Sequence, residues 1–213
     1  MDNNKINYRI PESKKDILLE DWIEFVKLKS EEEIDPEFLR LRMFEIFCGV
    51  PMEHATKLRQ TEIDEMDFHL TKVFEEKSEL VKKFEFEGVE YGFINDFDKD
   101  VTHGELIDLE NYYKEKEFDK VLSILYRPIT NESDGLYRIE PYESSHTKFL
   151  KLSFDLLDGA LSFFLHLYQK LLNQTLLFIQ KTFKKSKMKN MDYQEKLNSL
   201  LNGVDILKSY GYW

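Results

Sequence analysis

The stretch from Ser153 to Phe183 constrains the fold most, because its pattern is helical and it is apolar on more than one side. Its apolar residues are Leu156, Leu157, Ala160, Leu161, Phe163, Phe164, Leu165, Leu167, Tyr168, Leu171, Leu172, Leu176, Leu177, Phe178, Ile179 and Phe183. A helix with such a surface must be buried on several sides. Polar residues such as His166 and Gln174 interrupt every window of about 18 residues, so a membrane span is not expected. We therefore expect the domain core or a partner chain to cover this helix.

Helices account for most of the remaining pattern. Apolar residues spaced three and four apart predict helices over 16–28, 36–47, 52–58, 61–77, 102–113, 118–126 and 192–210. Two of these helices have defined starts. Asp35 precedes Pro36 and supplies a capping side chain, and Thr102 with Glu105 has the spacing of a capping box. Gly49 is expected to end the helix that Asp35 begins.

Strands are predicted in three short places. Residues 84–93 alternate between apolar and polar around Glu87-Gly88, which indicates a β-hairpin. Residues 136–139 favour a strand, 131–135 a loop, and 6–10 either a strand or an extended arm. The predicted fold class is mainly α (α+β): a helical bundle with a small β-hairpin or short antiparallel sheet and a long C-terminal helix. We divide the chain into an N-terminal helical region (1–82), a hairpin and helix-pair region (83–150) and a C-terminal region (151–213).

Charge is distributed unevenly along the chain, whose formal net charge is −11. Residues 1–159 hold 22 Lys and Arg against 38 Asp and Glu, a formal charge of −16, whereas residues 160–213 hold 8 against 3, a formal charge of +5. The lysines at 181, 184, 185, 187 and 189 concentrate positive charge near the end of the long helix. They are either a solvated helix terminus or a contact for an acidic partner, another subunit or nucleic acid. The acidic total makes nucleic acid and anionic membranes unfavourable partners.

The sequence shows no recognisable catalytic or metal-binding motif. Cys48 is the only cysteine, so disulfides within the chain and multi-thiolate zinc sites are excluded. The acidic loop 96–100 resembles a calcium loop, but Val101 stands where glycine is needed and Ile107 where a bidentate glutamate is needed. The histidines lie far apart, and glycine-rich phosphate loops do not occur. We expect no cofactor, no metal and no enzymatic activity. The N-terminus has no signal-peptide pattern, so we expect the protein to stay inside the cell.

Two groups of short segments carry a family resemblance. The first group is Ile10–Ser13, Asp21–Phe25, Met43–Pro51 and Leu58, and the second is Thr102–Tyr112, Val121–Ile129 and Tyr137–Glu143. Together they resemble structural and assembly proteins of tailed bacteriophages, in particular tail assembly chaperones and related hub or connector components. The resemblance spans roughly residues 8–165 and consists of packing residues and helix boundaries, with no catalytic signature.

The resemblance implies a non-enzymatic protein that binds other phage structural proteins, or further copies of itself, in the host cytoplasm during assembly, with or without remaining in the virion. The predicted contact residues are exposed members of the long helix and its basic end: Phe163, Leu167, Phe178, Lys184 and Lys185. Two alternatives remain. A regulatory host-interaction protein would use its acidic face to imitate DNA or occupy a basic enzyme surface, and an unrecognised enzyme would need polar groups clustered in a pocket.

Overall fold

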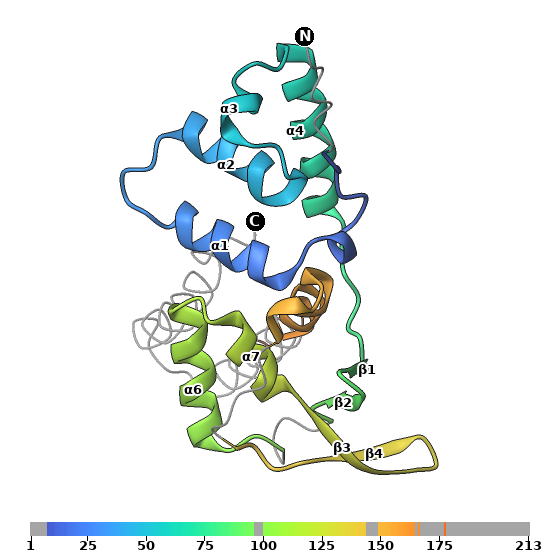
Figure 1. Cartoon of the computed structure of the whole chain (residues 1–213). Coiled ribbons are helices and arrows are strands. Elements are labelled where there is room, and N and C mark those ends of the chain that lie inside the picture. The colour runs from blue at the N-terminus through green and yellow to red at the C-terminus, as the bar shows by residue number, and fades with distance from the viewer. Residues whose placement is uncertain (1–7, 96–99, 144–148, 165, 167–176, 178–213) are drawn as a thin grey trace. The chain divides into compact units, whose positions relative to one another are not determined.

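The computed structural model describes residues 8–95, 100–143, 149–164, 166 and 177. Helices dominate, and a small antiparallel sheet accompanies them, which confirms the predicted mainly α (α+β) class (Figure 1). The chain divides into two compact units, Met1–Ser162 and Phe163–Trp213. The three sequence-based regions, 1–82, 83–150 and 151–213, stay a prediction.

The N-terminal part of the first unit is built of short helices. A 3-10 turn, η1 (Lys14–Asp16), precedes α1 (Leu19–Lys29), α2 (Pro36–Cys48), α3 (Met52–Ala55) and α4 (Gln60–Glu75). The predicted limits of α2 are confirmed: the Asp35 carboxylate accepts a hydrogen bond from the Phe38 N–H at 2.8 Å, and Gly49 ends the helix with φ of 69°. Residues 8–10 belong to no strand, and the Arg9 N–H donates to the Cys48 carbonyl at 3.1 Å.

Two clusters of apolar side chains hold these helices together. The buried core between α2, α3 and α4 comprises Phe44, Cys48, Val50, Ala55, Ile63, Met66 and Leu70. A second cluster forms around Trp22 of α1, whose ring stacks on Phe154 with 4.0 Å between centroids and also lies against Phe25, Phe47 and Phe74. Because Phe154 belongs to a distant part of the sequence, this cluster joins the N-terminal helices to the segment that follows residue 149.

The sheet has four strands in sequence order, all antiparallel: β1 (Lys83–Phe86), β2 (Val89–Phe93), β3 (Tyr126–Ser133) and β4 (Leu136–Ile139). The predicted β1–β2 hairpin and the predicted strand at 136–139 are both confirmed. Each hairpin turns on two residues with positive φ, Glu87 and Gly88 in the first and Asp134 and Gly135 in the second. Positive φ at both central positions matches the twist of antiparallel strands.

Helices α6 (His103–Lys114) and α7 (Phe118–Leu125) are described between β2 and β3 in the sequence. The predicted capping box is present, since the Thr102 hydroxyl accepts from the Glu105 N–H and the Glu105 carboxylate accepts from the Thr102 N–H. The predicted loop at 131–135 is wrong in most of its length. Helix α7 passes directly into β3, which continues to Ser133, and only Asp134 and Gly135 form the turn.

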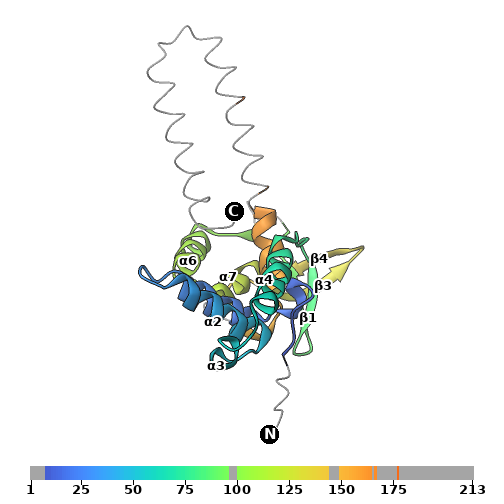
Figure 2. The same ribbon diagram turned by 90° about the horizontal axis from the view of Figure 1, so that it is seen from above.

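The beginning of the long apolar helix is a core element of the first unit. Helical residues run over 154–164, and the side chains of Phe154, Leu156, Leu157 and Ala160 are all buried. A Cβ atom added to Gly159 would lie 2.3 Å from the Glu79 carbonyl oxygen, so the backbones touch here. For this stretch, the expectation that the domain core covers the helix is confirmed. Figure 2 shows it in orange, with the β3–β4 hairpin projecting from the same unit.

Candidate interaction surface

Among the predicted contact residues, Phe163 is the one that the structure places. Its side chain is 40 % exposed, directly after the buried part of the helix. Leu177, another apolar residue of the same stretch, is helical and 55 % exposed. Leu167, Phe178, Lys184 and Lys185 lie outside the described residues. The apolar pattern therefore continues beyond the part that the core of the first unit buries.

The buried part of this helix is fastened to the N-terminal segment. The Leu19 N–H donates to the Leu152 carbonyl, and the Phe154 N–H donates to the Ile17 carbonyl, both at 2.8 Å. Nearby, the Lys14 ammonium and the Asp158 carboxylate form an ion pair of 2.6 Å, with side chains only 7 % and 8 % exposed. These contacts hold the start of the helix, up to Asp158, in the core of the first unit.

A second buried ion pair joins α6 to the start of β3. The Arg127 guanidinium lies 3.0 Å from the Glu105 carboxylate, with both side chains almost fully buried. It also donates to the carbonyls of Ile124 and Asp100 at 3.1 and 3.2 Å. These partners occupy most of the N–H donors of the guanidinium. Arg127 therefore holds the fold together and is not available to bind a ligand. The Tyr137 hydroxyl likewise donates to the Phe93 carbonyl at 2.7 Å.

The β3–β4 hairpin presents an apolar residue to solvent. Leu136 directly follows the turn and is 77 % exposed. Residues 130–136 are all exposed, so solvent reaches both faces of the hairpin near its turn. Figure 1 shows the hairpin reaching past β1 and β2. The signal in the sequence that points to Leu136 is the Asp-Gly turn before it, which is typical of a hairpin.

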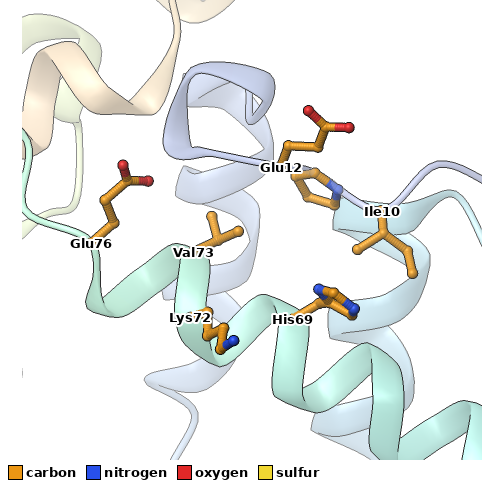
Figure 3. A pocket seen from close by; sticks show the side chains of 7 residues that line it. Ile10, Glu12, His69, Lys72, Val73 and Glu76 are labelled. Atoms are coloured by element: carbon orange, nitrogen blue, oxygen red, sulfur yellow. The ribbon is translucent and has the colours of Figure 1, made fainter.

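An open cavity of about 470 Å³ lies between α4 and the N-terminal arm. Its lining residues are Ile10, Pro11, Glu12, His69, Lys72, Val73 and Glu76. Figure 3 shows His69 and Val73 rising from α4 toward the arm that carries Ile10 and Glu12. The cavity thus combines apolar side chains with two basic and two acidic groups around them.

The thiol of Cys48 is poorly suited to act as a nucleophile. Cys48 is buried in the α2–α4 core, and burial raises the pKa of its thiol to about 11. The four histidines that the structure describes are separate: His54 is half-buried, and His69, His103 and His166 are exposed. Within the described ranges, groups of three or more His, Cys, Asp or Glu suited to hold a metal ion do not occur. The described helices include none long and apolar enough to cross a membrane.

Comparisons with protein-family models, with curated proteins and with solved structures gave no match for this chain. The resemblance to phage assembly proteins therefore remains a prediction from the sequence.

Proposed function

We propose that this chain is a non-enzymatic protein of tailed-phage virion assembly, which binds other structural proteins of the particle. One observation carries the proposal. The helix that begins at residue 154 is buried as far as Ala160, and the side chain of Phe163 is exposed; Leu177, later in the sequence, is also exposed. The sequence resemblance supplies the phage context.

The physical argument concerns what these side chains gain from a partner. Fully burying a phenylalanine or leucine side chain is worth about 1.5–3 kcal/mol relative to leaving it in water. Aromatic residues are enriched at the centres of protein interfaces for this reason. The buried ion pair between Lys14 and Asp158 holds the start of the helix in the core of the first unit. Opposite charges on residues 1–159 and 160–213 would orient a partner of matching polarity.

The test is deletion of the reading frame from a phage that encodes it. We expect assembled particles to be lost and to return when the wild-type chain is supplied from a plasmid. Quantitative mass spectrometry of purified particles then separates two roles, because a chaperone leaves the mature particle and a structural subunit remains in it. Unchanged particle yield after deletion would refute the proposal.

A second candidate function, an acidic host-interaction protein, is favoured by a different observation. The side chains of Glu31, Glu32 and Glu33 are all exposed in the segment between α1 and α2. Such a surface suits a basic partner, and its binding would weaken steeply with added salt. In the deletion experiment, this function predicts normal particles and an altered host response.

A further inference from the structure

The exposed end of the β3–β4 hairpin is a candidate contact surface for a partner protein. A two-stranded hairpin is only marginally stable alone in water, and its stability comes from packing on one face. Contacts hold this hairpin as far as the pair that precedes the turn pair: the Lys83 ammonium pairs with the Glu132 carboxylate at 2.8 Å, and the hydroxyl of Tyr137, the register partner of Glu132, donates to the Phe93 carbonyl. Beyond them Leu136 stands 77 % exposed, higher than any other large apolar side chain among the described residues.

The first hairpin of the sheet provides an internal comparison. Val89 follows the Glu87-Gly88 turn as Leu136 follows the Asp134-Gly135 turn, and it is 41 % exposed. The two positions have the same turn geometry, but the longer side chain is the more exposed one. Leu136 also lies between charges of opposite sign, because Asp134 and Arg138 are both exposed.

The cavity between α4 and the N-terminal arm has apolar and charged groups that complement those of the β3–β4 turn. Ile10 supplies apolar surface, with the buried side chains of Val73 and Pro11 beside it. The open cavity of about 470 Å³ has room for one leucine side chain. Lys72 in the last turn of α4 and Glu76 at the cap that follows the helix add a basic and an acidic group at the cavity. Lys72 is opposite in charge to Asp134, and Glu76 is opposite in charge to Arg138.

We propose that the occupant of this cavity is the β3–β4 turn of a second copy of the chain. Leu136 of one copy inserts beside Val73 of the next, with Asp134 toward Lys72 and Arg138 toward Glu76. The turn and the cavity are different surfaces, so each contact leaves one turn and one cavity unoccupied. Contacts of this heterologous kind repeat into a ring or a filament. The inference goes beyond the proposed function, because binding to other virion proteins through Phe163 does not require it.

Sedimentation velocity of the full chain, from about 1 µM to about 200 µM, tests the proposal. The wild-type chain is expected to associate as concentration rises. Leu136→Asp should weaken association about tenfold or more, because a carboxylate would have to enter an apolar cavity. Val89→Asp is the matched control and should leave association unchanged. Both positions are exposed, and circular dichroism of each variant checks that it folds. A wild-type chain that stays monomeric, or equal effects of the two variants, would overturn the proposal.

Mixing two variants identifies the partner as a second copy in the proposed orientation. Lys72→Glu opposes Asp134 and should weaken association, and adding Asp134→Lys in the same chain should restore it. Leu136→Asp keeps an intact cavity, whereas Lys72→Glu keeps an intact turn. An equimolar mixture of these two variants should therefore form a one-to-one dimer that neither forms alone. A mixture that remains monomeric contradicts the head-to-tail contact. Lys72→Glu that associates by itself as strongly as the wild type, as a contact between two Leu136 side chains would allow, contradicts it as well.

Discussion

Replacing Asp158 by asparagine should destabilise the first unit strongly. The variant keeps the shape of the side chain but leaves the Lys14 ammonium without its partner, at a site where the two side chains are 7 % and 8 % exposed. Removing one member of a buried ion pair costs about 3–5 kcal/mol, because the remaining charge is buried and uncompensated. The ammonium lies 5.7 Å from the centre of the Phe154 ring, which offsets little of that cost.

Urea unfolding, followed by tryptophan fluorescence, measures this loss. Trp22 stacks on Phe154 beside the ion pair and should report the transition. The double variant Lys14→Met/Asp158→Leu should recover most of the stability, because well-packed apolar residues can replace a buried pair at little or no cost. Glu110→Gln removes the exposed pair with Lys114 and should cost at most about 0.5 kcal/mol. A loss below about 1 kcal/mol for Asp158→Asn would refute the reasoning.

Three further changes test other parts of the structure. Gly159→Ala should lower the free energy of unfolding by about 1–3 kcal/mol, because its Cβ would meet the Glu79 carbonyl oxygen; an unchanged urea midpoint would contradict this contact. Asp35→Ala should cost about 1 kcal/mol through loss of the helix cap, measured in the same way, and no cost would mean that the cap is dispensable. For Cys48, the free energy of unfolding should fall as pH rises from 9.0 toward about 11, because the thiol ionises there in the unfolded chain but stays protonated in the folded one. Cys48→Ala should have a shallower slope, since tyrosines such as Tyr126, whose pKa burial also raises, still contribute, and equal slopes for both proteins would contradict the shifted pKa of the thiol.

Local chemistry made several elements predictable from the sequence. Asp35 and Gly49 mark the two ends of α2, and Thr102 with Glu105 marks the start of α6, because each satisfies backbone groups that a helix end leaves unpaired. The β1–β2 hairpin was predictable because alternation surrounds a Glu-Gly turn. These signals depend only on neighbours in the sequence.

The third strand was missed because its signals conflict. Tyr126 continues the apolar pattern of α7, and Pro128 argues against a central strand. In the structure, the Pro128 carbonyl accepts from the Glu140 N–H at 2.9 Å, just beyond the last residue of β4. Because this part of β3 lies opposite Glu140, beyond the end of β4, the absent N–H of Pro128 removes no hydrogen bond between β3 and β4. This compatibility depends on register, which sequence spacing alone does not provide.

The candidate surface was predictable only in part. The apolar pattern after residue 153 pointed to Phe163, but it did not show that burial extends to Ala160 before exposure begins. That division depends on the distant contacts of Lys14 and Trp22 with this helix. The cavity against α4 was equally out of reach, because it joins the arm at Ile10 to residues far along the chain.

In the proposed function, apolar residues that follow the buried part of the C-terminal helix bind other virion proteins. Complementation of the deleted phage by Phe163→Asp and by Phe38→Asp tests it most directly, since the two phenylalanines are 40 % and 41 % exposed and differ mainly in location. We predict wild-type particle yield with Phe38→Asp and a yield lower by about tenfold or more with Phe163→Asp, because an interface would have to bury a charge. Equal yields from the two variants would contradict the claim.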